Sequence, residues 1–379
     1  MLKSFLGLLS FVLVLPASFQ NIPSKTIATE APHIQVSLLL DTSNSMDGLI
    51  DQAKSQLWKM VNELATAKKD GQSPDIEIAL YEYGNDRLAA TEGYIRQVTG
   101  LTADLDLVSE KLFALTTNGG SEYCGYVIKE AVKQLTWSDD NADMKIIIIA
   151  GNEPFDQGPE PYREACKSAI EKGIMINTIF CGNYDEGVNT LWKDGADLAD
   201  GKYFNIDQDQ KVVHIPTPYD QRILELNQKL NSTYIGYGDQ GEERVMMQSA
   251  QDVNAASYGA ANARERASVK AKSTYKNTSW DLVDAVEADE EAIDKLDKDD
   301  LPEEMRSMTK EEQKTYVETK AKERQAVQTE ILDLEQKAKA FQDEKRKEMA
   351  ENGDENTLDK VMSKAMREQA RQKGYEIDN

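Results

Sequence analysis

The sequence predicts an α/β protein: a doubly wound, mostly parallel six-stranded sheet of the Rossmann-like kind, followed by a charged α-helical tail. Three observations predict this class. Short β-rich runs alternate with amphipathic segments from residue 34 to residue 206, the rhythm of a parallel sheet covered by helices. The run 146–149 consists of four isoleucines, as expected of a strand buried on both faces. The last 99 residues carry 29 acidic and 18 basic side chains, which favours solvated helix.

The strands are expected where β-branched and aromatic residues cluster between turn-forming segments. These runs span residues 34–40, 76–83, 94–98, 144–150, 174–180 and 202–206. Between them, apolar residues recur with the 3.6-residue period of an amphipathic helix. The predicted helices cover residues 49–64, 105–112, 126–135, 162–171 and 191–199. Gly71, Gly173 and Gly201 mark turns between these elements.

The pattern changes after Pro216 and Pro218. Residues 219–235 are expected to form a helix, and residues 242–271, rich in Ala, Gln and Glu, a helix of modest burial. From residue 281 the chain is either a long solvated helical arm or partly disordered. A heptad seam at 327–341 lasts only about two heptads, too few to establish a coiled coil. A short helical hairpin folded back on the sheet domain is an equally weighted alternative, and the charge density predicts a tail without a core of its own, dispensable for folding.

The N-terminus has the layout of a secretory signal. Lys3 precedes an apolar stretch at 5–15, and the helix-breaking Pro16 and the small residues Ala17 and Ser18 follow it. The mature chain is therefore expected to begin between residues 18 and 22 and to be secreted or to lie in the periplasm or cell envelope, as a bacterial protein. No later stretch reaches about 18 consecutive apolar residues, so no stable membrane insertion is expected after signal removal. The expected domains are the signal at 1–20, the sheet domain at 33–210, a helical extension at 211–275 and the charged region at 276–379.

Charge and cysteine content exclude several classes of function. The net charge of −23 repels phosphate backbones and predicts no nucleic-acid partner, but it suits divalent cations or basic partners. Two histidines and three cysteines provide no zinc spacing. In an exported protein a disulfide is permitted. We expect Cys166, in a helix, to pair with Cys181, at the end of the next strand, with Cys124 as the rival partner.

The stretch Asp41-Thr-Ser-Asn-Ser45 directly follows the first predicted strand. Ligands of an open parallel sheet collect at the carboxyl ends of its strands. Asp41, Ser43 and Ser45 are each two residues apart, so their oxygens can converge on one point. A carboxylate with two hydroxyls suits a hard cation: Mg²⁺, or alternatively Ca²⁺ or Mn²⁺. The same residues are also ordinary helix N-caps, and position in the fold favours the metal site.

These residues resemble the von Willebrand factor A (VWA) family, whose D-x-S-x-S loop forms a metal-ion-dependent adhesion site (MIDAS) after the first strand. The resemblance covers roughly residues 33–207 and implies a VWA fold with Asp41, Ser43 and Ser45 as metal ligands. It implies a hydroxyl from a second loop, for which Ser121 is the first choice and Thr117 the second. Glu122 is an alternative carboxylate there.

The family's third loop provides an Asp, but the corresponding position here is Gly151. Glu153, or Asp156, can reach the metal through water instead, or the site is weakened.

Three functional interpretations follow. The first, implied by the resemblance, is a secreted, non-enzymatic binding protein whose metal accepts an acidic side chain of a protein partner. The second is an envelope scaffold in which the metal site is weak or vestigial. The third is a metal-dependent hydrolase, the least favoured because no acid–base pair is evident beyond the ligands and no catalytic motif of the hydrolase or P-loop type occurs.

Overall fold

A six-stranded sheet forms the centre of the first domain. The computed structural model of the chain describes residues 31–206, 215–350 and 358–377, so the predicted signal peptide lies outside the described residues. The strands are β1 (His33–Asp41), β3 (Asp75–Tyr83), β4 (Ile95–Thr102), β5 (Met144–Gly151), β6 (Ile174–Cys181) and β7 (Tyr203–Ile206). Their order is β4-β3-β1-β5-β6-β7, and only the β3–β4 pair is antiparallel. The predicted fold class is confirmed.

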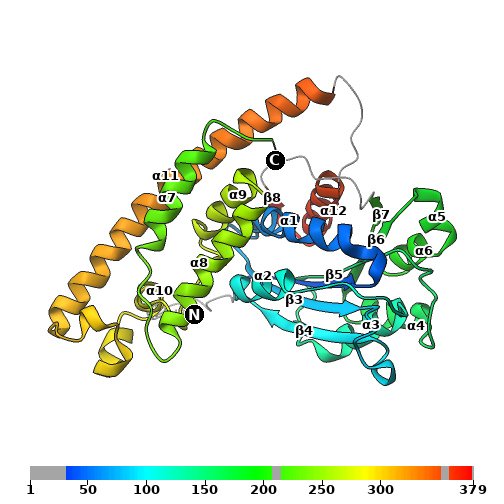
Figure 1. Ribbon diagram of the computed structural model, residues 1–379, viewed down its shortest axis with the longest axis horizontal. Coiled ribbons are helices and arrows are strands. Elements are labelled where there is room, and N and C mark those ends of the chain that lie inside the picture. Colours follow the sequence, from blue (N-terminus) through cyan, green and yellow to red (C-terminus); the bar gives the residue numbers. More distant parts are fainter. Residues whose placement is uncertain (1–30, 207–214, 351–357, 378–379) are drawn as a thin grey trace, which may run out of the picture. The chain divides into compact units, whose positions relative to one another are not determined.

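Helices cover both faces of this sheet (Figure 1). They are α1 (Asp47–Leu64), α2 (Leu105–Phe113), α3 (Cys124–Gln134), α4 (Tyr162–Glu171), α5 (Tyr184–Asn189) and α6 (Trp192–Asp197). Along β5, Ile146 and Ile148 belong to one hydrophobic cluster with α1 and α2, whereas Ile147 and Ile149 belong to another with α3 and α4. Alternate side chains of one buried strand thus serve two cores, which explains the unbroken isoleucine run.

The two faces of the sheet also determine whether the predicted disulfide can form. Cys166 packs in the cluster with α3 and α4, and Cys181 packs in the cluster on the opposite face. Cys124, Cys166 and Cys181 are all free and buried. The predicted disulfide between Cys166 and Cys181 is therefore wrong, because the strand residue that faces the α4 side is Phe180, one position earlier.

A helical segment follows the sheet. It contains α7 (Asp220–Asn231), α8 (Gly241–Ser257), α9 (Ala260–Lys270), α10 (Leu282–Ala288) and the 41-residue α11 (Lys310–Ala350). Short 3-10 turns lie at Asn44–Met46, Ala90–Glu92, Ala292–Lys295, Lys298–Asp300 and Glu303–Met305. Gly259, with φ of 106°, separates α8 from α9 where one continuous helix was predicted. A small third cluster around Leu282, Ile293 and Met305 gives this segment a core, contrary to the expectation from its charge.

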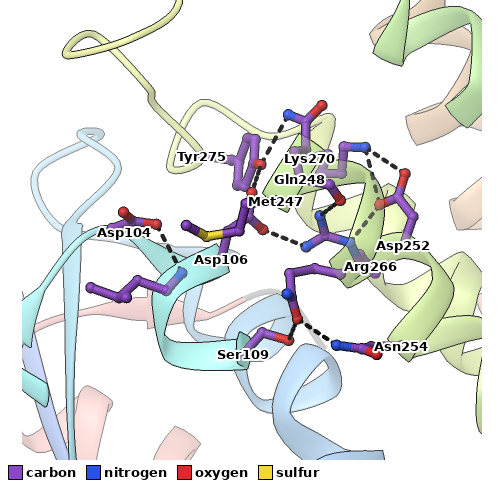
Figure 2. A network of polar contacts seen from close by, with 12 residues as sticks. Asp104, Asp106, Ser109, Met247, Gln248, Asp252, Asn254, Arg266, Lys270 and Tyr275 are labelled. Carbon is purple, nitrogen blue, oxygen red and sulfur yellow. Dashed lines mark hydrogen bonds and ion pairs between the residues drawn. The ribbon is translucent and has the colours of Figure 1, made fainter. Parts of the chain in front are cut away.

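Helix α9 is almost entirely buried, so the predicted modest burial is wrong for it. It contacts α1, α7, α8 and α11. Figure 2 shows how its charges are satisfied: the Arg266 guanidinium donates to Asp106 of α2 at 2.7 Å and to Asp252 of α8 at 2.5 Å. Asp106 also accepts from the Tyr275 hydroxyl at 2.6 Å. Charged residues here form a largely buried link between the sheet domain and the helical segment.

The C-terminus returns to the sheet domain. Helix α12 (Leu358–Gln372) packs on α1, and β8 (Glu376–Ile377) pairs antiparallel with β2 (Ala67–Lys68). Met366, Ala370, Tyr375 and Ile377 belong to the same hydrophobic cluster as β1 and α1. The tail predicted to be dispensable thus contributes to the main core. No helix among the described residues is both long and apolar enough to cross a membrane.

Candidate metal centre

Asp41 ends β1 and is completely buried. Its Oδ1 accepts a hydrogen bond from the Ser43 backbone N–H at 2.7 Å, which folds the chain back over the carboxylate. The 3-10 turn Asn44–Met46 then brings the Ser45 hydroxyl to 3.2 Å from the Ser43 hydroxyl. The alternation of Asp41, Ser43 and Ser45 is therefore converted by a tight turn into one cluster of oxygens, as predicted.

A second carboxylate lies against Asp41. Glu122, just before α3, is only 4 % exposed. A Cβ placed on Gly84 would lie 2.7 Å from both Asp41 Oδ1 and Glu122 Cγ, so the two side chains share the space that the glycine leaves open. The Glu122 backbone N–H is held by the Gln157 side chain at 2.6 Å. From the sequence, Glu122 is only an alternative carboxylate ligand, whereas in the structure it lies next to Asp41.

The electrostatics of this pair favour a bound cation. Burial, and next the charge of Glu122, raise the pKa of Asp41 well above its ordinary value. Burial also raises the pKa of Glu122, although hydrogen bonds from Asp41 and Ser43 oppose this shift. Two neighbouring carboxyls in a dry setting cannot both ionise without a compensating positive charge. Either a proton or a cation must therefore accompany them.

Three oxygens at the site have no hydrogen-bond partner among the described residues. They are Asp41 Oδ2, Glu122 Oε2 and Asn152 Oδ1, all buried. The Asn152 side chain comes from the loop after β5 and donates from Nδ2 to the Ser45 hydroxyl at 3.1 Å. Buried acceptors without donors are costly in a protein interior, and together with two hydroxyls they form an oxygen donor set that fits a hard divalent cation. No group of three or more His, Cys, Asp or Glu side chains in the described part of the chain is placed to hold a metal ion.

The remaining predicted ligands have other roles in the structure. Thr117 donates to Asp47 at the start of α1. Ser121 is partly buried, and Glu153 is exposed at the surface. The charge of Glu153 nevertheless raises the pKa of Glu122, so it lies near enough to influence the site. Asn152 is not among the predicted ligands and Glu122 is only an alternative there, since neither has a local sequence signature.

Gly151 explains the departure at the third loop. A Cβ at this position would lie 2.5 Å from the Tyr83 hydroxyl and 3.1 Å from Asp41 Oδ2. The Tyr83 hydroxyl donates to the Ala150 carbonyl at 2.9 Å and is completely buried. Tyrosine from β3 therefore occupies the room that an aspartate side chain would need, and the carboxylate comes from Glu122 in the second loop instead.

Backbone contacts join the loops around the centre. The Thr42 N–H donates to the Tyr83 carbonyl at 2.8 Å, and the Asn118 N–H donates to the Thr42 carbonyl at 2.9 Å. A Cβ on Gly120 would lie only 2.1 Å from the Gly84 carbonyl oxygen. Only glycine permits this approach, so the Gly119-Gly120 pair serves to bring the second loop down to Asp41.

The von Willebrand factor type A domain family matches residues 35–217, the span that carries both the sheet and this centre. Residues 35–217 form a VWA domain. A comparison with curated protein sequences finds no match.

Solved structures similar to this VWA domain come from several sources. One is an aerotolerance-related membrane protein from Bacteroides fragilis NCTC 9343 with multiple mutations to serines, at 16 % identity and a TM-score of 0.33, covering 46 % of this chain and 92 % of that one. The SpRpn10 VWA domain is 15 % identical, with a TM-score of 0.35. The match covers 48 % of this chain and 100 % of that one. The vWF domain of the type V pili tip protein Mfa5 from Porphyromonas gingivalis is 14 % identical, with a TM-score of 0.32. The match covers 47 % of this chain and 90 % of that one.

Proposed function

We propose that this chain is a non-enzymatic binding protein whose VWA domain holds one divalent cation and recognises an acidic side chain of a protein partner. The ligands from the chain would be Asp41, Ser43, Ser45 and Glu122. The observation that carries the proposal is the pair of buried carboxyls with unpartnered oxygens beside two serine hydroxyls. We further propose that it acts outside the cytoplasm, secreted or in the cell envelope, as the signal-like residues 1–20 indicate.

The donor set supports Mg²⁺, with Ca²⁺ or Mn²⁺ as alternatives. When bound, the cation would supply Lewis acidity toward an oxygen ligand of the partner. With two carboxylates from the chain and hydroxyls as the other ligands, the cation's positive charge is only just balanced, and Mg²⁺ keeps water where protein carboxylates are few. An incoming carboxylate can therefore compete for a position. Gly151, in place of a third acidic side chain, supports this balance.

Calorimetric titration of the full chain with Mg²⁺, Ca²⁺ and Mn²⁺ tests the proposal. We expect saturable heat and thermal stabilisation at up to about 10 mM cation, since extracellular sites of this kind bind weakly. Asp41→Ala should abolish both effects without loss of the fold, and Glu122→Gln should weaken the affinity. Thr117→Ala is the matched control, because the Thr117 hydroxyl donates a hydrogen bond to Asp47.

One result would favour the scaffold alternative. If all three cations give neither heat nor stabilisation at about 10 mM, the two carboxyls hold a shared proton rather than a metal. The VWA domain would then act through its surface, with a vestigial centre. Retained partner binding after treatment with a chelator would have the same meaning.

A further inference from the structure

A cleft of about 490 Å³ lies between the C-terminal part of α1, the α9 region and α11. It is separate from the metal centre, because Asn62 lies 15 residues along α1 from Asp47, roughly 22 Å at the helical rise. Its lining carries charges of both signs together with the apolar side chains of Leu332 and Ala340. A cavity of this size accommodates a small molecule.

Arginines lie beside the acidic side chains of the cleft, and one of them, Arg264, is shared by Glu265, Glu335 and Asp220. Glu63 accepts two hydrogen bonds from the Arg367 guanidinium of α12, at 2.7 and 2.8 Å. The other three pairs are Glu265 with Arg264 at 3.0 Å, Asp343 with Arg346 at 3.3 Å and Glu335 with Arg264 at 3.7 Å. Arg264 is completely buried and also lies 3.5 Å from Asp220.

Two lysines of the cleft make no close ion pair with the described residues, although the charges of Glu265, Glu335 and Glu63 oppose the lowering of the Lys272 pKa by burial. The Lys272 ammonium donates to the Asn62 carbonyl at 3.1 Å and to Asn62 Oδ1 at 2.7 Å, both neutral acceptors. Lys339 of α11 makes no hydrogen bond or ion pair with any residue that the structure describes, and its charge lowers the pKa of Lys272. In a protein of net charge −23, this cleft therefore still offers the Lys339 ammonium to an anion.

Glu335 adds a hydrogen-bond donor to the same cleft. Burial, and next the charge of Glu265, raise its pKa to about 8, so its carboxyl is largely protonated at neutral pH. Its Oε2 is buried without a hydrogen-bond partner among the described residues. Burial likewise lowers the pKa of Lys272. A negatively charged ligand would stabilise the Lys272 ammonium and accept a hydrogen bond from the Glu335 carboxylic acid.

We propose that this cleft binds a small organic oxyanion, a carboxylate or a phosphate, between the ammonium groups of Lys272 and Lys339. The aliphatic side chains of Leu332 and Ala340 contact its organic part. Because α1 belongs to the VWA domain and α11 to the helical segment, the bound anion holds the two together and raises the unfolding temperature.

Thermal unfolding and calorimetry of the full chain, in a buffer stripped of divalent cations on a chelating resin, test this site apart from the metal centre. The probes are succinate and inorganic phosphate, with succinamide as the neutral counterpart of succinate. We expect at least one anion to bind and stabilise the protein, and succinamide to do neither. Lys339→Gln should weaken anion binding about tenfold, the loss of one close charge pair. Lys272→Met tests the more buried ammonium.

Lys322→Gln is the matched control, because Lys322 lies on the same helix with its side chain 80 % exposed. It should leave anion binding unchanged. Asp41→Ala should also leave it unchanged, which separates this site from the proposed function. The proposal is overturned if neither anion binds at about 10 mM, if succinamide binds as well as succinate, or if Lys322→Gln weakens binding as much as Lys339→Gln does.

Discussion

At the residue scale, the contact between Gly151 and Tyr83 shapes the candidate metal centre. The tyrosine hydroxyl lies where a side chain at position 151 would begin, and it donates to the Ala150 carbonyl. A residue on β3 thus leaves no room for an acidic side chain at position 151. The Cys124 thiol lies 3.8 Å from the same hydroxyl.

Gly151→Asp should destabilise the protein by about 1–3 kcal/mol, because the new Cβ overlaps the Tyr83 hydroxyl and a well-packed site cannot expand freely. The double variant Gly151→Asp with Tyr83→Phe removes the overlapping oxygen and should recover part of this loss. It should also bind Mg²⁺ more tightly than the original chain, since it adds a carboxylate. Chemical denaturation and calorimetry of both variants measure these effects. Equal stability of Gly151→Asp and the original chain contradicts the steric argument.

Glu335 should make stability depend on pH. Its pKa of about 8 in the folded chain lies above the unfolded value of about 4.3, so the folded state binds the proton more tightly. The stabilisation is fully present below the unfolded value and is lost as the pH rises through about 8. Unfolding temperatures of the ligand-free chain should therefore fall from pH 6 to pH 9, and Glu335→Gln should reduce that fall. Parallel curves for the two proteins contradict this assignment.

The sequence predicts the part of the centre that is local in the chain. Asp41, Ser43 and Ser45 are set by one turn after a buried strand, and spacing alone places their oxygens together. Glu122 and Asn152 reach the site from two other loops, so their contribution depends on how closely Gly120 passes Gly84. That close approach is a tertiary contact, and no spacing within a single segment encodes it.

At the element scale, α9 shows how a polar helix can be buried. Arg266 is 1 % exposed, contacts acids on α2 and α8, and lies 4.5 Å from the Trp58 ring of α1. The Ala and Arg residues of α9 predict a solvated helix, because the periodic pattern of large apolar residues is missing. The partners that satisfy these charges lie up to 160 residues away, beyond the reach of local pattern. The strands were predicted to within a few residues because buried β-branched runs are local signals.

Arg266→Met should lower stability by about 3–5 kcal/mol, because it leaves Asp106 buried without a cationic partner, whereas Asp252 keeps Lys270 at 3.0 Å. Arg244→Met is the control on α8. Its ion pair with Asp104 is about one-quarter exposed on each side, so the loss there should stay near or below about 1 kcal/mol. Urea denaturation of the two variants gives the comparison. Similar losses would mean that burial of the Arg266 network does not govern its effect.

At the scale of the whole molecule, the sheet domain is completed by the end of the chain. Helix α12 covers α1, and the Asn177 and Gln369 side chains donate to each other at 2.9 and 2.8 Å. Composition could not reveal that α12 packs on α1, because the apolar residues of α12 are few and lie within a charged tail. Their positions matter only once α12 faces the apolar surface beside Leu57 and Met60.

A chain ending at residue 350 should therefore be much less stable than the full chain. The deletion exposes core around Met366, Tyr375 and Ile377, each at most 7 % exposed, and one such side chain is worth about 2–5 kcal/mol. Tyr375→Phe is the matched control: it removes only the hydroxyl bond to the His33 carbonyl at 2.7 Å and should lose about 1 kcal/mol. Thermal unfolding and solubility measure both. A shortened chain as stable as the full one would restore the expectation of a dispensable tail.

The bond from Tyr375 to His33 also has a consequence for the order of events during synthesis. β1 leaves the ribosome early, and Tyr375, whose hydroxyl donates to the His33 carbonyl, follows 342 residues later. At about 5–20 residues per second, the sheet domain waits through the translation of the whole helical segment for this contact. Throughout that interval the core around Tyr375 is incomplete, and its apolar surface is available to a chaperone.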